Sequence, residues 1–282
     1  MGEPSFWVVT DSAADLPVQV AKQWDIHVVP LWVQIGTREY RDGVDLDAPA
    51  FYRLITQGDQ LPHTTQPSPT DFEQLYRTLS PTRPILSIHL SSQLSGTFQS
   101  ARLAASSLPE LDIHPIDTQS ASLGVGLLAV RAARLAQQGT PAAEAEAKVR
   151  QWARQLQVVF TVRSLEWLRR NGRIGRAQAL VGGLLHVQPV LGLDAGVVAP
   201  LEQVRTRARA LQRLAELVQS GAGAQPVEVG IVHGDCADEA EQLFRQLQER
   251  LTVAASLVTW AGPTIGTHAG PGTIGLIVLP AS

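Results

Sequence analysis

The sequence is poor in several residue types, and each shortage excludes a class of protein. Its 282 residues include a single cysteine, Cys236, so no disulfide can form within the chain, which fits a reducing compartment. Only 17% of the residues are charged, the formal net charge is −3, and no run of Lys or Arg occurs. A protein that binds nucleic acid usually carries a basic patch, so we expect no nucleic-acid partner.

Long apolar segments are also missing. No run of 18 apolar residues occurs, which is the length that a membrane-spanning helix needs, so we expect no stable membrane insertion. The N-terminal stretch MGEPSFWVVTDS lacks the basic region and long apolar run of a signal peptide. We therefore expect a cytoplasmic protein.

The common motifs for nucleotides, metals and hydrolysis are absent. The chain has no GxxxxGK[ST] phosphate loop, no GxGxxG after its first strand and no GxSxG nucleophile elbow. No two of its seven histidines stand at metal-ligand spacing, and Cys236 has no CxxC partner. We expect no metal, no cofactor and no ATP site in this chain.

What the sequence does contain is an alternation of apolar strands and helices, with 44% hydrophobic residues overall. Up to about residue 157 this alternation predicts a mostly parallel sheet with helices on both faces. From residue 158 a predicted hairpin turn at 194–196 and further strands indicate a mixed sheet with helices. The prediction is two α/β domains, residues 1–157 and 158–282. In the first, we expect one strand over 27–35 and a helix over 16–24 capped by Asp15.

The segment PILSIHLSSQLSGTFQSARLA, residues 84–104, changes character in its middle. Its first part predicts a buried strand, and Thr97 begins a predicted helix. Between them lies the hydroxyl-rich turn 91–96. The free N–H groups and dipole of a helix N-terminus suit an anion, and ligands of open α/β sheets lie at the carboxyl ends of strands. Plain capping of the helix by Ser92 or Ser95 explains the turn equally well.

Three further polar segments adjoin apolar ones. They are PHTTQPSP at 62–69, RRNGRIGR at 169–176 and TIGTHAGPGTIG at 264–275. In the last, His268 stands in what we expect to be a glycine-rich loop, and Gly266, Gly270 and Gly272 would allow the backbone to approach a ligand closely. His268 could equally be a hydrogen-bonded structural residue. The arginines near Arg173 could simply form a solvated face.

Together with other segments, these motifs resemble the DegV family in the same order along nearly the whole chain. Seven segments each resemble a family motif. They are, in chain order, VTDSAADLP, VVPLWVQIGTREYRDGVDL, TTQPSP, SSQLSGTFQSA, SLEWLRRNGRIG, VQPVLGLDAGVVAPLEQVRT and GTHAGPGTIG. Thr65 stands where the family has serine, and Asn171 stands where it has glycine. Any one of these matches is weak, but seven in order are not expected by chance.

The resemblance implies two α/β domains with a long-chain fatty acid bound between them. It implies a binding subunit without catalytic residues of its own, whose bound carboxylate a separate ATP-dependent fatty acid kinase subunit phosphorylates to an acyl phosphate. Carried over by motif, the carboxylate contacts would be Thr64, Thr65, Ser95, Gly96 and His268. Arg205 would lie near the head group or on the kinase-docking face, and Arg173 is a weaker candidate for that face.

The residues leave room for other functions. Ser95 as nucleophile with His268 as base would make the chain an acyl hydrolase or transferase, although no acidic third member is evident. A triose- or sugar-binding domain related to dihydroxyacetone kinases would have a compact polar pocket instead of a long apolar one. The stretch ALVGGLLHVQPVLGL, residues 179–193, could wall an apolar tunnel or belong to an ordinary core.

Overall fold

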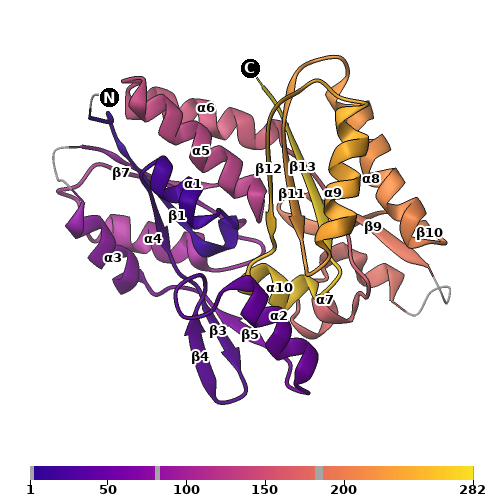
Figure 1. The fold of residues 1–282 in the computed structure, drawn as a ribbon. Coiled ribbons are helices and arrows are strands. Elements are labelled where there is room, and N and C mark those ends of the chain that lie inside the picture. Colours follow the sequence, from indigo (N-terminus) through magenta and orange to yellow (C-terminus); the bar gives the residue numbers. More distant parts are fainter. Residues whose placement is uncertain (1–2, 80–82, 182–186, 282) are drawn as a thin grey trace.

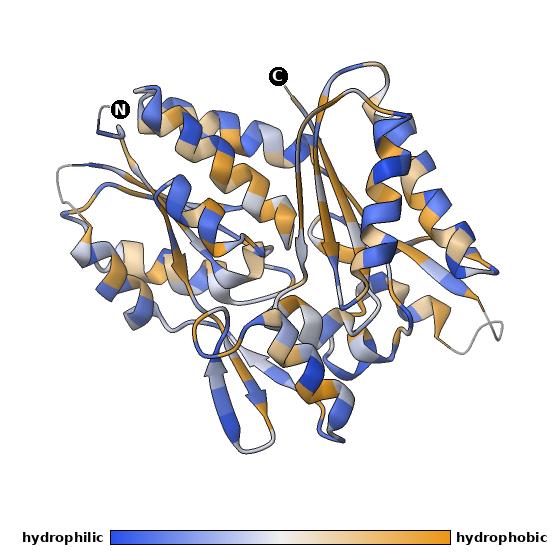
Figure 2. Ribbon diagram, in the orientation of Figure 1, coloured by the Kyte–Doolittle hydropathy of each residue, from blue (hydrophilic) through white to orange (hydrophobic). Residues whose placement is uncertain are grey.

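The computed structural model describes residues 3–79, 83–181 and 187–281. Within them, the chain forms three sheets with helices packed around them (Figure 1). The helices α5 (Leu123–Gln137) and α6 (Ala142–Gln155) lie along the top of the view, and the short helix α10 (Pro263–Ala269) lies low in the centre. In colour by hydropathy, the strands of the largest sheet are mostly hydrophobic, whereas helices α8 (Arg207–Ala222) and α9 (Ala237–Gln248) are hydrophilic outside (Figure 2).

The N-terminal sheet is entirely parallel, with strand order β2-β1-β6-β7. Its strands are β1 (Trp7–Asp11), β2 (Ile26–Val29), β6 (Ile85–His89) and β7 (Ile113–Asp117). Val8 and Val9 are neighbours on β1 and point to opposite faces. Val8 packs in the cluster that includes α5, and Val9 in the cluster of α3 (Pro69–Thr78) and α4 (Thr97–Ser106). Both faces are therefore covered, as the sequence pattern predicted.

The second large sheet is mixed, with order β10-β9-β8-β13-β11-β12. Its strands are β8 (Gln157–Thr161), β9 (Gln188–Asp194), β10 (Val197–Val204), β11 (Val227–His233), β12 (Val253–Trp260) and β13 (Ile274–Pro280). Only β11 and β12 pair in parallel. The predicted hairpin is present, because Ala195 and Gly196 take positive φ angles between β9 and β10. The predicted α/β fold is confirmed, whereas the division after residue 157 stays a prediction.

A third, antiparallel sheet of order β4-β3-β5 corrects one prediction. The single strand expected over 27–35 is in fact two, since Pro30 separates β2 from β3 (Trp32–Ile35), and the two join different sheets. The other strands of the small sheet are β4 (Arg38–Arg41) and β5 (His63–Thr65), within a segment expected to be irregular. The helix α2 (Ala48–Gln57) packs beside this sheet.

Two predicted helix caps are wrong. Helix α1 (Val18–Gln23) begins after Pro17, and Asp15 instead ends a short 3-10 helix, η1 (Ser12–Ala14), with a positive φ of 50°. The predicted helix at Thr97 is confirmed as α4, but its first residue follows Gly96 without a side-chain cap from Ser92. Ser92 is exposed. The remaining short elements are α7 (Glu166–Arg170) and the 3-10 helix η2 (Gly175–Leu180).

Candidate functional site

The segment that carries His268 is a helix and not the expected loop. Residues Pro263–Ala269 form α10, and Gly270 follows it with a positive φ. The three glycines serve packing within the protein: a Cβ at Gly266 would lie 2.6 Å from Phe51, and one at Gly270 would lie 2.4 Å from Trp167. A Cβ at Gly272 would likewise meet Arg163. The space beside the backbone of these glycines, which we expected a ligand to use, is therefore filled by side chains of the protein itself.

A small polar cavity of about 50 Å³ lies against α10. We call it the polar cavity; its lining residues are Leu31, Thr64, Leu90, Leu94, Ser95, Arg173, Thr264, Ile265 and His268. Thr64 Oγ1 lies 2.8 Å from His268 Nε2, within hydrogen-bond distance. Three of the residues predicted from the sequence, Thr64, Ser95 and His268, thus come together from strand β5, the turn before α4 and helix α10.

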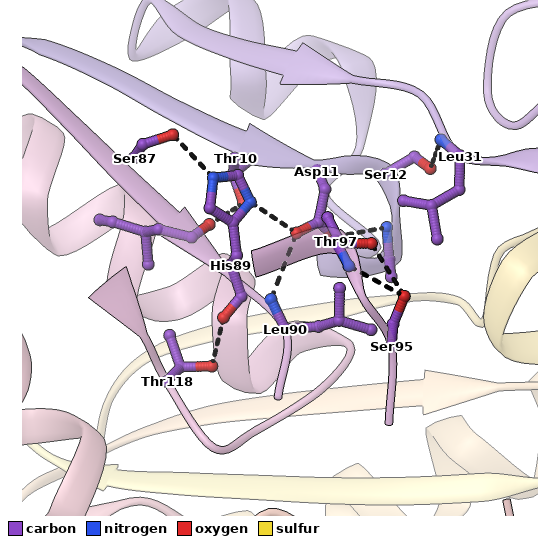
Figure 3. A network of polar contacts seen from close by, with 12 residues as sticks. Thr10, Asp11, Ser12, Leu31, Ser87, His89, Leu90, Ser95, Thr97 and Thr118 are labelled. Carbon is purple, nitrogen blue, oxygen red and sulfur yellow. Dashed lines mark hydrogen bonds and ion pairs between the residues drawn. The ribbon is translucent and has the colours of Figure 1, made fainter. Parts of the chain in front are cut away.

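The turn that brings Ser95 to this cavity leaves the carboxyl end of β6 above a buried polar network (Figure 3). The carboxylate of Asp11 accepts from His89 Nδ1 at 2.8 Å and from the N–H of Leu90 at 3.2 Å. The Ser95 hydroxyl lies 2.9 Å from Thr97 Oγ1 and accepts from the Thr97 N–H at 3.3 Å. The turn is therefore held by hydrogen bonds of its own hydroxyl groups and by the Asp11 carboxylate of β1, which accepts from the N–H of Leu90.

His268 is electrically neutral at ordinary pH. Burial, and after it the charge of Arg173 and of His63, lowers the pKa of His268 to about 3. Its Nδ1 is buried and has no hydrogen-bond partner among the described residues. If Thr64 donates to Nε2, the proton of the neutral ring lies on Nδ1, which can then donate to a ligand.

Arg173 supplies the positive charge of the polar cavity. Its guanidinium donates to the carbonyl oxygens of Leu94 at 3.0 Å and Asn171 at 2.7 Å. Asn171 in turn donates to the carbonyl oxygen of Thr267 in α10 at 2.9 Å. The NGRIG segment is therefore a part of the cavity wall, whereas the sequence had made Arg173 a weak candidate for a docking face.

Three other predicted residues lie outside the lining of the polar cavity. Thr65 is exposed, because neighbours on a strand point to opposite faces and Thr64 takes the inner one. The Gly96 N–H donates to Gln66 Oε1 at 3.1 Å, so it is already occupied. Arg205 is exposed just after β10.

An apolar cavity of about 100 Å³ adjoins the polar one. It lies against one face of the mixed sheet, with walls from β8 to β11 and β13, from α7 and α10, and from the residues before α5. Val158, Phe160, Leu193 and Val198 are among its lining side chains. Ile265 and His268 line both cavities, so the two meet at α10. Of the predicted tunnel stretch 179–193, Leu193 lines this cavity, and residues 182–186 lie outside the described residues.

A much larger groove, of about 690 Å³, lies at the start of α10, where Gly262 and Pro263 line it. We call it the acidic groove, because the carboxylates of Asp11, Asp15 and Asp42 are in its wall. Burial raises the pKa of Asp42 to about 6 and raises the pKa of Asp15 well above its usual value. The sequence predicts Asp15 only as a helix cap and assigns no role to Asp11 or Asp42, although all three stand in segments that resemble the family, VTDSAADLP and VVPLWVQIGTREYRDGVDL.

Comparison with known proteins identifies the family. The family model described as "Uncharacterised protein, DegV family" matches residues 5–281. The chain belongs to the DegV family. Protein DegV of Bacillus subtilis is 35% identical to it over 272 residues, which cover 95% of this chain and 97% of that protein.

Solved structures of DegV proteins share the fold. A DegV family protein from Thermus thermophilus, described by its fatty acid binding, superposes with a TM-score of 0.92 at 34% identity, covering 98% of this chain and 99% of that one. DegV from Bacillus subtilis, described as a fatty acid binding protein, superposes with a TM-score of 0.89 at 33% identity, covering 98% and 99%.

Two further features bear on this DegV chain. Among the residues with described positions, no helix is long and apolar enough to cross a membrane. In the same residues, no group of three or more His, Cys, Asp or Glu is arranged to hold a metal ion.

Proposed function

We propose that this DegV chain binds one long-chain fatty acid, with the carboxylate in the polar cavity and the hydrocarbon tail in the apolar cavity. The observation that carries the proposal is the junction of the two cavities at Ile265 and His268. An amphipathic ligand needs a polar and an apolar compartment in direct continuity. The description of two similar DegV proteins as fatty acid binding supports the same ligand.

The energetics of such a ligand give the two cavities different roles, with the apolar cavity supplying binding energy and the polar cavity pairing the carboxylate. Burying about 15 methylene groups at roughly 0.8 kcal/mol each would contribute on the order of 12 kcal/mol. Part of this gain is consumed by association, by ordering of the tail and by the widening that a cavity of about 100 Å³ needs to hold it. The polar cavity then has to keep the carboxylate from being buried unpaired, which would be very costly. The hydroxyls of Thr64 and Ser95, the Nδ1 of His268 and the charge of Arg173 are suited to that task.

Two other functions receive less support from the contacts. A Ser95 hydrolase needs a base on the nucleophile, yet among the described residues the Ser95 hydroxyl bonds within its own turn and His268 pairs with Thr64. A triose or sugar site would be compact and polar throughout, whereas this polar cavity shares the lining residues Ile265 and His268 with an apolar one. A triose or sugar ligand would also leave the apolar cavity without a function.

We further propose that the chain presents the bound carboxylate to an ATP-dependent kinase subunit, which forms the acyl phosphate. In this role the chain needs no cofactor and no catalytic residue of its own. Arg205 is suited to the docking face, because it is exposed and, in the described part of the chain, makes no hydrogen bond or ion pair through its side chain. A free guanidinium at the surface can pair with a carboxylate or phosphate of a partner.

The proposal is tested by extracting the purified protein with organic solvent and measuring the released lipid by mass spectrometry. We expect fatty acid at close to one molecule per chain. Protein from which lipid has been removed should take up added fatty acid with the same stoichiometry. A chain that carries no fatty acid and takes up none when it is offered would refute the proposed ligand.

A further inference from the structure

One hydroxyl in the polar cavity has no hydrogen-bond partner within residues 3–79, 83–181 and 187–281. Thr264 is only 2% exposed, and its Oγ1 makes no hydrogen bond with any described residue. The other two hydroxyls that line the cavity are engaged, Thr64 with His268 and Ser95 with Thr97. Leaving a buried hydroxyl unpaired costs free energy, and an unpaired buried group calls for an explanation such as a bound ligand.

The position of Thr264 on its helix explains why the hydroxyl is free. Thr267, on the same helix, turns its hydroxyl back to the carbonyl oxygen of Pro263, at 2.8 Å. Such a bond to the preceding turn is the usual fate of a threonine hydroxyl inside a helix. Thr264 stands near the start of α10, so the residue four positions earlier, Trp260, lies in β12 and not in a helical turn. Thr264 also stands four residues before His268, on the same helix face.

The backbone at Thr264 is held from the acidic groove. Asp42 accepts the Thr264 N–H at 3.2 Å, and Asp15 accepts the Gly262 N–H at 2.9 Å. The Thr264 hydroxyl also lies close enough to the Asp42 carboxylate to lower the pKa of Asp42, although without the alignment of a hydrogen bond. Thr264 therefore lines the polar cavity with its main chain held by Asp42, and its hydroxyl, although near Asp42, completes no hydrogen bond with a described residue.

We propose that Thr264 is a further ligand of the fatty-acid carboxylate and donates its hydroxyl proton to a carboxylate oxygen. Asp42 acts as a positioning residue, since it holds the main chain of Thr264 from behind. This inference rests on the proposed function and adds a residue to it. It also explains why the chain tolerates an unpaired buried hydroxyl, because the ligand completes its hydrogen bonding.

The test uses the delipidated full-length protein and a long-chain saturated fatty acid, with affinity measured by calorimetric titration. Thr264→Val preserves the branched shape and removes the hydroxyl. We expect it to weaken binding about tenfold or more, because a hydrogen bond to a charged group is lost. Thr264→Ser should retain most of the affinity. Thr267→Val is the matched control, since it removes an equally buried hydroxyl from the same helix, and it should bind within twofold of the wild type.

A second measurement separates ligand binding from structural support. Without ligand, Thr264→Val should lower the melting temperature less than Thr267→Val does, because only Thr267 loses a hydrogen bond made within the protein, the one to the carbonyl oxygen of Pro263. If Thr264→Val does not fold, Thr264→Ala takes its place. Wild-type affinity in the valine or alanine variant would overturn the inference and leave the proposed function standing. If the wild type itself binds no fatty acid, the proposed function fails.

Discussion

The acidic groove lies at the start of α10, the polar cavity is lined by residues further along the same helix, and the two differ in size and charge. The groove encloses about 690 Å³ and the polar cavity about 50 Å³. By size alone the groove would be the ligand site. Among the described residues, however, its wall holds the buried carboxyl groups of Asp11, Asp15 and Asp42 beside the single cation Lys22, whereas the lining of the polar cavity offers hydroxyls, a neutral imidazole and the charge of Arg173 and includes no acidic side chain. For a carboxylate ligand, the chemistry of the wall therefore outweighs the volume.

The largest loss of fatty acid affinity is expected when a bulky side chain is placed in the apolar cavity, and the same substitution in the acidic groove is the comparison. Val198 is 4% exposed and lines the apolar cavity, and Val44 is 60% exposed at the groove. Val198→Phe should weaken fatty acid binding more than about 1,000-fold, because the tail loses several buried methylenes. Val44→Phe should leave the affinity unchanged. Titration of both variants checks this, and the opposite pattern would place the ligand in the groove.

The next test addresses the cost of the buried aspartates. Burial raises the pKa of Asp42 from its unfolded value near 3.8 to about 6. A carboxyl group with a raised folded pKa binds its proton more tightly when folded, so stability falls as the pH rises from about 4 through 6. At pH 7.5 the penalty is about 3 kcal/mol. The groups that face the Asp42 carboxylate are Asp11, Asp15, Ser12 and Thr264.

Asp42→Asn removes this charge and keeps an acceptor for the Thr264 N–H. Urea unfolding should therefore show a gain in stability at pH 7.5 that shrinks as the pH falls toward 4. Asp47→Asn is the control, since Asp47 also lines the groove but lies at its exposed edge, where its side chain caps α2. A gain of the same size at both pH values would show that ionisation of Asp42 is not the cause.

A smaller effect on fatty acid affinity is expected at His268, and His27 in the groove serves as its control. His268→Ala should weaken fatty acid binding about tenfold through lost hydrogen bonds. Because the pKa of His268 is about 3, this loss should be the same at pH 6.5 and 8. His27, whose pKa burial also lowers, lines the groove, and His27→Ala should bind normally. Equal affinity of the His268 variant and the wild type would remove the histidine from the site.

The smallest effect on lipid affinity is expected at Arg205. Because its side chain is outside both cavities, Arg205→Ala should bind fatty acid within twofold of the wild type. Phosphorylation of the bound acid by the kinase subunit should nevertheless slow, and Arg209→Ala, which removes an exposed cation that pairs with Glu216, serves as the control. Unchanged phosphorylation kinetics in the Arg205 variant would exclude its docking role.

Much of the fold followed from local patterns. The alternation of strands and helices predicted the covered parallel sheet, and Asp194-Ala195-Gly196 predicted the hairpin between β9 and β10. The small sheet was missed, because β4 and β5 have four and three residues and little apolar content. Helix α10 was missed as well, since its Gly266 is unfavourable in a helix and is retained to let Phe51 and Tyr52 pack closely.

The sequence by itself determined the family, the general alternation of strands and helices and the turn that carries Ser95, because these depend on residues close together in the chain. Only the tertiary structure decided which of Thr64 and Thr65 faces His268, since a shift of one residue in a strand reverses the faces. It also decided that Arg173 and Thr264 share one cavity, although they are far apart in sequence. Which unpaired groups face a ligand depends on how distant elements pack, and no local pattern records that.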